Sequence, residues 1–268
     1  MAYTIRNFTT NDDAAVIARA GCFSVLEWKR DLSVSPESAQ EAWFASEMNV
    51  RRRQLIAEIN GKPGVILQAG AMQWMVGDIK STTGVKGAGD LFGKLVRGAV
   101  SQDSAIKPEY VGTGTVVCEP TWSYVTLLDL SDWGGSVVLD DGIFLACDAH
   151  LKHSLQRRSN FSSATAGNEG LWNLRIDGAG VLALEIPCPP EELVFVDLKD
   201  DELKIDGNYA LAWSSSLDFK VARSGKTLVG SAVSGEGLVN MYRGTGTVMM
   251  APMQPATRFA VDASKPTD

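Results

Sequence analysis

The two histidines of the chain lie close together, in the segment Asp148-Ala-His-Leu-Lys-His153. An aspartate and two imidazoles are common metal ligands, so this segment is the first place to look for a metal centre. On a β-strand, residues 150 and 153 point to opposite faces, and only Asp148 and His150 converge. A third ligand would have to come from elsewhere in the chain. We therefore interpret the segment as a surface strand of mixed polarity, keep Asp148 and His150 as weak metal candidates, and expect no cofactor.

Two other patterns with chemical potential also fall short of a catalytic site. The segment 224–227 (Ser-Gly-Lys-Thr) ends like a phosphate-binding loop, but Lys220 stands where that motif needs its first glycine, and a strand pattern follows instead of a helix. Glu119 and Glu185 occupy matching positions of a repeat described below, and paired carboxylates can transfer protons. The third copy has Ala251 at that position, which weakens a shared role. We predict no catalytic residues.

Charge, cysteines and hydropathy narrow the class of protein. The formal net charge is −7, so we expect no nucleic-acid partner. Four cysteines are present, with no CxxC pair among them, and we expect buried thiols in a reducing compartment: Cys22, Cys118, Cys147 and Cys188. The N-terminal residues lack an apolar signal core, and no apolar run approaches the ~20 residues of a membrane helix. The sequence therefore predicts a cytoplasmic protein without a membrane span.

The elements that would position these side chains are organised by a repeated glycine signature. Three Gly-x-Gly segments each lead into a short apolar run, and their first glycines are 66 residues apart in both intervals. These segments are Gly112-Thr-Gly114, Gly178-Ala-Gly180 and Gly244-Thr-Gly246. A second set of glycines keeps step with the first, each followed two residues later by a large side chain: Gly70, Gly142 and Gly207. Equal spacing of similar segments indicates a threefold internal repeat, and these nine glycines are its structural markers.

The repeat divides the chain into an extension, a main domain and a tail. We predict three units over about residues 54–120, 121–187 and 188–253, followed by a C-terminal tail over 254–268. Short apolar runs cut by Gly, Pro, Asp and Asn predict an all-β fold. Residues 1–53 form an N-terminal extension, in which Ser35 suits a helix N-cap and Pro36 the first helical turn, predicting a helix over about 36–50. We interpret Arg51 to Arg53 as helix-end and solvated charge, with a phosphate site as the alternative.

Together, the segment 235–239 (Gly-Glu-Gly-Leu-Val), the Gly-x-Gly copies and the Gly-Ala-Met segment at 70–72 resemble the AIM24 family, also called DUF124. The resemblance covers about residues 54–253. It implies three TRAP-like β units, of β-sandwich or double-stranded β-helix type, in a pseudo-threefold arrangement within one chain. The bacterial members of this family have no assigned activity, and the resemblance transfers no catalytic residue.

Three functional hypotheses stay open at this point. The leading one is a non-catalytic β scaffold that binds a protein partner, a small ligand or itself. The second is a cupin-like metal-dependent enzyme that uses His150. The third is RNA binding by analogy with the TRAP-like fold, which the acidic composition disfavours. The sequence leaves the choice between a monomer and a homo-oligomer undecided.

Overall fold

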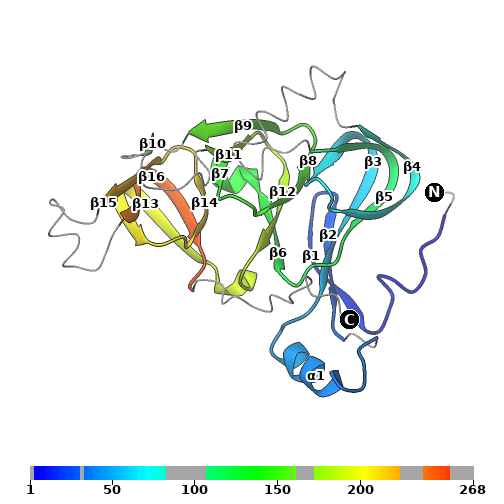
Figure 1. The fold of residues 1–268 in the computed structure, drawn as a ribbon. Helices are drawn as coiled ribbons and strands as arrows, with labels where there is room; N and C mark the ends of the chain where they lie inside the picture. The colour runs from blue at the N-terminus through cyan, green and yellow to red at the C-terminus, as the bar shows by residue number, and fades with distance from the viewer. Residues whose placement is uncertain are drawn as a thin grey trace, which may run out of the picture.

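The computed structural model describes residues 3–30, 33–82, 107–157, 159–160, 172–223 and 238–253. Over these residues the chain is built mainly of strands, with a single α-helix and short 3-10 turns, which confirms the predicted all-β class. The strands form two sheets that lie side by side, with α1 (Ala39–Glu47) protruding below the first (Figure 1). Within the described ranges, no helix is long and apolar enough to cross a bilayer.

Each sheet contains eight of the described strands. The first holds β1 (Ala14–Ala20), β2 (Phe23–Trp28), β3 (Arg53–Leu67), β4 (Met72–Thr82), β5 (Glu109–Cys118), β6 (Tyr124–Asp129), β8 (Phe144–Asp148) and β12 (Val181–Ile186). The second holds β7 (Ser136–Leu139), β9 (Lys152–Arg157), β10 (Ser159–Asn160), β11 (Trp172–Asp177), β13 (Val194–Asp206), β14 (Ala210–Ser214), β15 (Asp218–Arg223) and β16 (Leu238–Met250). The 3-10 turns are η2 (Leu130–Trp133) and η3 (Pro190–Glu192). Apart from the short β10–β15 contact, these pairings are antiparallel, and many of them join strands that are not consecutive in the chain, such as β3 with β8 and β6 with β12.

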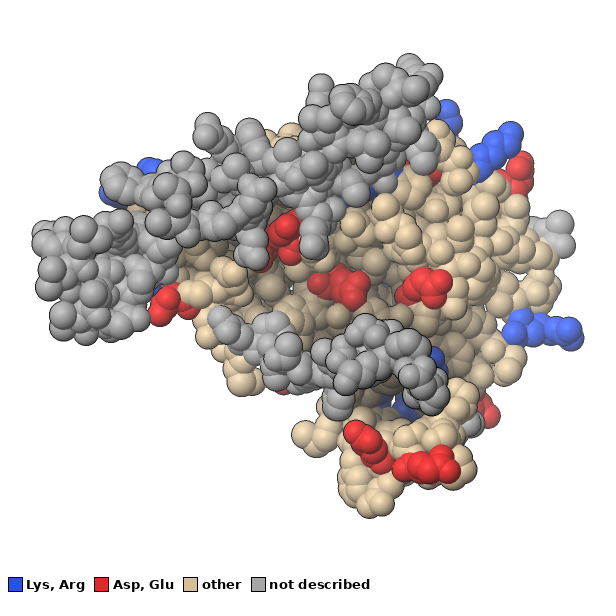
Figure 2. Space-filling model, viewed as in Figure 1, with Lys and Arg blue, Asp and Glu red and all other residues tan. Residues whose placement is uncertain are grey.

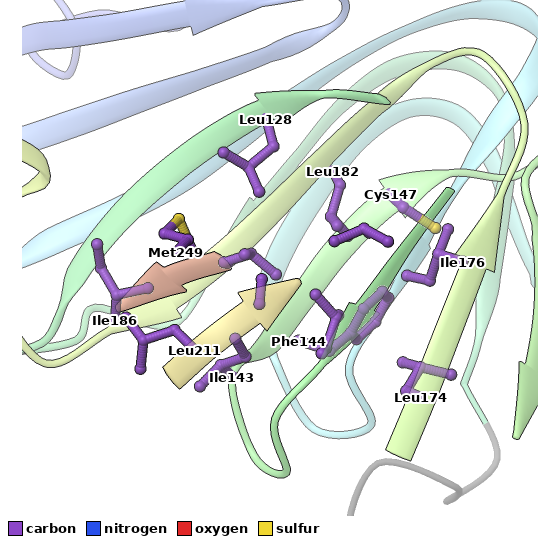
Figure 3. Packing of buried hydrophobic residues seen from close by; sticks show 14 of the residues in the cluster. Leu128, Ile143, Phe144, Cys147, Leu174, Ile176, Leu182, Ile186, Leu211 and Met249 are labelled. Carbon is purple, nitrogen blue, oxygen red and sulfur yellow. The ribbon is translucent and has the colours of Figure 1, made fainter. Parts of the chain in front are cut away.

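The apolar faces of the strands meet in a core that crosses from one sheet to the other. Met249 of β16 and Leu211 of β14 pack with Leu128 of β6 and Leu182 of β12, and all four side chains are at most 9% exposed. Figure 3 shows Met249 and Leu211 entering this cluster from the second sheet. Because these contacts remove apolar surface of both sheets from water, they stabilise one continuous fold.

Three antiparallel strand pairs share one register: β4 with β5, β8 with β12, and β14 with β16. The residue six positions after the first signature glycine pairs with the first residue of the earlier strand, and a one-residue bulge follows on that earlier strand. The pairs are Met72 with Cys118, Phe144 with Leu184, and Ala210 with Met250. The residue seven positions after the first signature glycine ends each strand pair with the same backbone hydrogen bond. Glu119 N–H donates to Ala71 O at 2.7 Å, Glu185 N–H to Ile143 O at 2.8 Å, and Ala251 N–H to Tyr209 O at 2.9 Å.

The backbone of the signature glycines explains why glycine stands there. The first glycines of the three signatures share a positive φ, at 140° for Gly112, 133° for Gly178 and 127° for Gly244. A Cβ atom on Gly112 would lie 1.9 Å from the carbonyl oxygen of Asp78 on the neighbouring strand. A side chain is therefore excluded both by the backbone angle and by the close approach of β4.

Matched strand pairings also join the strand that precedes the first of these strand pairs to the second pair, and the strand that precedes the second pair to the third. Leu67 of β3 pairs with Ala146 of β8, and Leu139 of β7 pairs with Ala212 of β14. In both cases the carbonyl oxygen of the bulged residue accepts a backbone hydrogen bond from the residue that follows the partner strand. Gln68 N–H donates to Leu145 O and Asp140 N–H donates to Leu211 O, each at 2.8 Å. In the described part of the chain, no third junction of this kind links β13 to β4.

On these matched registers, we propose that the chain consists of three units close to the predicted boundaries of 54–120, 121–187 and 188–253. The units follow one another as an open series in the described strands. The pseudo-threefold arrangement and the TRAP-like character of each unit stay predictions, and the predicted tail at 254–268 lies outside the described residues.

The N-terminal extension corrects one prediction. The helix spans Ala39–Glu47 instead of about 36–50, and Ser38 rather than Ser35 is its N-cap residue. Ser35 instead accepts a turn bond from Ser38 N–H through its carbonyl oxygen, at 3.1 Å, so the helix starts one turn later. The rest of the extension is the β1–β2 hairpin, whose Phe23 and Val25 are at most 1% exposed against β3.

Candidate functional site: a groove between the second and third units

The structure places Asp148 at the end of β8 and His150 in the turn that follows, not on one continuous strand, and both side chains bind the backbone there. Asp148 accepts a hydrogen bond from the Val181 N–H at 2.8 Å, and His150 Nε2 lies 2.6 Å from the carbonyl oxygen of Ala179. A Cβ on Gly180 would be 2.8 Å from the Asp148 carboxylate. Over the described ranges, no three His, Cys, Asp or Glu side chains gather in a way that would hold a metal ion. The contacts indicate that both residues fasten the second signature turn.

His153 lies apart from His150, partly buried on β9. Its Nε2 is 3.1 Å from the Cys147 sulfur, and its ring meets Phe144 edge-on with centroids 5.7 Å apart. Burial, and next the positive charge of Lys107, lower the pKa of His153 to about 4. The imidazole is therefore neutral at physiological pH and packs against core residues.

The four cysteines are free thiols, and their surroundings disfavour the reactive thiolate. Burial and then the nearby Asp148 carboxylate raise the pKa of Cys22 to about 12. Burial, followed by the charges of Glu185 and Glu119, raises the pKa of Cys118 to about 12 as well. Burial also raises the pKa of Cys147 and of Cys188. None of these thiols has the lowered pKa that an active nucleophile requires.

Arg53 corrects the interpretation of the arginine run as solvated charge. Its side chain is buried, and Nη2 lies 2.8 Å from the Glu27 carboxylate and 2.7 Å from Asn49 Oδ1. Its guanidinium also stacks 4.1 Å above the Tyr124 ring. Arg51 binds the other Glu27 oxygen at 2.8 Å. The cluster ties β2 and the first residue of β3 to the second unit, so the guanidinium of Arg53 is already occupied and does not support the phosphate alternative.

A surface groove between the second and third units is the best candidate for a binding site. It has a volume of about 260 Å³ and is lined by Leu127, Leu128, Asp129, Asp132, Trp133, Phe195 and Thr247. Phe195, which lines the groove, is 52% exposed, whereas its neighbour Val194 points to the opposite face of β13. A large apolar side chain that stays this open at a hollow on the surface is typical of an interaction site.

Carboxylates surround the apolar floor of the groove. Asp129 accepts bonds from the backbone N–H and the hydroxyl of Ser131, which lower the pKa of its carboxyl. Asp197, beside Phe195 on β13, accepts a bond from the Thr247 hydroxyl at 2.7 Å. Asp132 is exposed on η2. More widely, acidic side chains lie across the middle of the face seen in Figure 2 and over α1, whereas basic ones lie mostly at its rim. The groove therefore suits a ligand that is apolar and positively charged.

Sequence reasoning did not find this groove, because its parts come from segments that are far apart in the chain. In the sequence, Trp133 stands beside a Gly-Gly pair and Phe195 lies within a short apolar run, and neither pattern marks a binding site. A comparison of equivalent positions gives a partial signal: Leu127 lies opposite Ala183 and Phe195 lies opposite Met249, so they are matching residues of two units.

Comparison with known proteins agrees with the fold and leaves the activity open. A crystal structure of a Streptococcus pyogenes protein, solved in a structural genomics programme, is 25% identical to this chain, with a TM-score of 0.56, and the match covers 76% of this chain and 89% of that one. An uncharacterised protein from Streptococcus pyogenes serotype M6 is 27% identical over 191 residues, which is 69% of this chain and 75% of that protein. The family model described as mitochondrial biogenesis AIM24 matches residues 48–253, and the chain therefore belongs to the AIM24 family.

Proposed function

We propose that this chain is a non-catalytic β scaffold that binds a partner protein in the groove between its second and third units. The observation that carries the proposal is the exposure of Phe195 in that groove, while the equivalent residue of the first unit is covered. Ile56, which matches Phe195, is 3% exposed beneath the N-terminal extension. An apolar strand surface that one unit covers and another leaves open favours a role in binding.

The chemistry of the reactive side chains supports binding over catalysis. The thiols of Cys22 and Cys118 have raised pKa values, and His153 is held neutral by its partial burial. His150, on which the enzyme hypothesis depends, is occupied by the Ala179 carbonyl oxygen. We also propose a cytoplasmic location, because four free cysteines suit a reducing compartment.

Site-specific photo-crosslinking in the native host tests the proposal. A photoreactive phenylalanine analogue replaces Phe195 in one variant and Phe44 in a control, because Phe44 is 59% exposed on α1, away from the groove. We expect one recurrent protein adduct from position 195 that position 44 does not give. The purified adduct partner should bind the unmodified chain, and Phe195→Ser should weaken that binding at least tenfold, while Phe44→Ser leaves it unchanged.

The other outcomes separate the alternatives. An adduct of twice the chain mass would show self-association instead of a distinct partner. A retained metabolite in native mass spectrometry that is lost in Phe195→Ser would show a small-ligand site. Equal adducts from both positions, or none from position 195, would overturn the proposal.

A further inference from the structure

The groove has a filled counterpart elsewhere in the same chain. Leu127 and Phe195 are matching residues, so the strands β6 and β13 occupy equivalent places in the second and third units. Beside β6, between the first and second units, the β1–β2 hairpin lies in the corresponding position. Its Phe23 and Val25 are buried with Leu55 of β3 and Val125 of β6, and Leu127 packs against the same cluster.

The occupant of that counterpart is a pair of extended strands. β2 pairs antiparallel with β3, with Ser24 opposite Ile56 and Val25 opposite Leu55, and β1 lies on the outer side of β2, next to β6. The hairpin thus supplies backbone hydrogen bonds at a strand edge together with apolar side chains for the space between units. No equivalent hairpin covers β13 in the described part of the chain.

The edge of β13 is correspondingly open. Among the described strands, β13 pairs only with β16, so the opposite edge has no strand partner. An unpaired edge beside exposed Val194 and Phe195 is a template for an added strand. A helix seated in the groove would leave the backbone groups of this edge to water.

Charge indicates the chemistry of the added strand. Asp129, Asp132 and Asp197 flank the apolar floor, so favourable pairing requires lysine or arginine on the incoming segment. A second copy of this chain is disfavoured as the occupant, because its net charge of −7 would meet an acidic rim.

We propose that the groove receives an extended strand of a partner protein that carries both apolar and basic side chains on the face turned toward the groove, and that this strand adds to the free edge of β13 over residues 194–198. The inference rests on the proposed function, since it specifies the class of partner for the same groove. The apolar side chains lie against Phe195 and Trp133, and the basic ones lie toward the aspartates.

A peptide series tests the inference on the full chain. The probes are an eight-residue peptide in which valine and lysine take turns at every second position with threonine between them, its counterpart with glutamate in place of lysine, and a peptide with the lysine–valine composition in an order that has no two-residue period. We expect only the first to bind at low salt and to slow amide hydrogen exchange over residues 194–198. Phe195→Ser and Asp132→Lys should each weaken its binding at least tenfold, and Phe44→Ser should have no effect.

Failure of the inference is distinct from failure of the proposed function. Binding that needs Phe195 but gives no exchange protection over residues 194–198 would overturn strand addition, whereas the crosslinking result would still stand. Equal binding of the three peptides, or no binding of the lysine–valine peptide, would overturn the inference as well. Protection that is equal in Phe195→Ser and in the unmodified chain would place the added strand elsewhere and contradict it.

Discussion

The guanidinium of Arg53 lies 2.8 Å from the carboxylate of Glu27, and the two residues face each other across β2 and β3. Arg53 is 1% exposed and Glu27 is 7% exposed, so the pair is removed from water. The pair joins β2 to the first residue of β3, and the contact of Arg53 with Tyr124 extends the link to the second unit. A buried charge of this kind needs its partner, because the desolvation of each ion is offset by the other.

Arg53→Met should lower the free energy of unfolding by about 3–5 kcal/mol, since it leaves a buried carboxylate with part of its pairing lost. Arg51→Met is the matched control, because Arg51 binds the same carboxylate from a more exposed position and should cost about 1 kcal/mol or less. Urea unfolding of both variants measures the difference. Equal losses in the two variants would contradict a special role for the buried pair.

The stability of the chain should fall in mild acid because of His153. Its pKa is about 4 in the fold and about 6.5 in the unfolded chain, so only the unfolded state gains a proton between these values. The contribution of His153 to the free energy of unfolding is on the order of 2 kcal/mol for this partly buried group. It is present above about pH 6.5 and is lost as the pH falls toward 4. His153→Phe should flatten this part of the profile, and thermal unfolding from pH 4 to 8 measures it. Phe219 holds the matching position in the third unit, so phenylalanine should fit. An unchanged slope in the variant would show that other groups cause it.

Gly112→Ala should destabilise the fold by about 3 kcal/mol or more, because the added Cβ meets the Asp78 carbonyl and the backbone angle is unfavourable. Gly134 is the control: its φ is 65°, but a Cβ there meets nothing within 4 Å. Gly134→Ala should therefore cost only about 1 kcal/mol, from the backbone angle alone. Chemical denaturation of both variants tests the contrast, which would be wrong if the two costs agreed.

Deletion of residues 1–28 should cause aggregation. The deletion removes β1 and β2, and so uncovers the edge of β3 and the buried side chains of Leu55 and Ala57. Size-exclusion chromatography with light scattering measures the outcome. A deletion of residues 3–12, which removes only the segment before β1, is the control for shortening. A monodisperse 1–28 deletion would show that the hairpin is dispensable.

The cysteines should resist modification in the folded chain. At pH 8, thiol reagents need the thiolate, which the raised pKa values of Cys22 and Cys118 disfavour. We expect slow reaction in buffer and rapid reaction of four thiols in denaturant, followed by absorbance with a disulfide reagent. Fast labelling of one thiol in the folded state would reveal an activated cysteine.

The shared backbone of the signature glycines was predictable because glycine at a fixed spacing reports a backbone requirement directly, while the threefold repeat built on them stays a proposal. Gly112 and Gly178 occur 66 residues apart and share nearly the same positive φ. The helix start was not predictable from Ser35 and Pro36, since a turn closed by Ser38 precedes the helix and local propensity does not distinguish the two. The role of Arg53 was also hidden, because its burial depends on β2 and Tyr124, which lie elsewhere in the sequence.

In the candidate site, too, local sequence patterns predict some features, while others depend on contacts between distant segments. The strand period predicted Asp148 and His150 on one face of a strand, whereas His150 lies in the turn after β8, where that period does not apply. It could not show that backbone groups already occupy both side chains. The groove at Phe195 depends on how two units lie against each other, and no local pattern encodes that relation.

The matched junctions link each proposed unit only to its neighbours in the series. The free energy of unfolding is then approximately a sum of terms for the single units and terms for the junctions between them. Gln68 bonds to Leu145 and Asp140 bonds to Leu211, so the middle unit shares a boundary with both neighbours, whereas each outer unit shares only one. The hairpin of the extension acts as a cap for the first unit. The third unit has one neighbour and no described cap, so opening fluctuations should begin there, at the unit that carries Phe195 and the open strand edge.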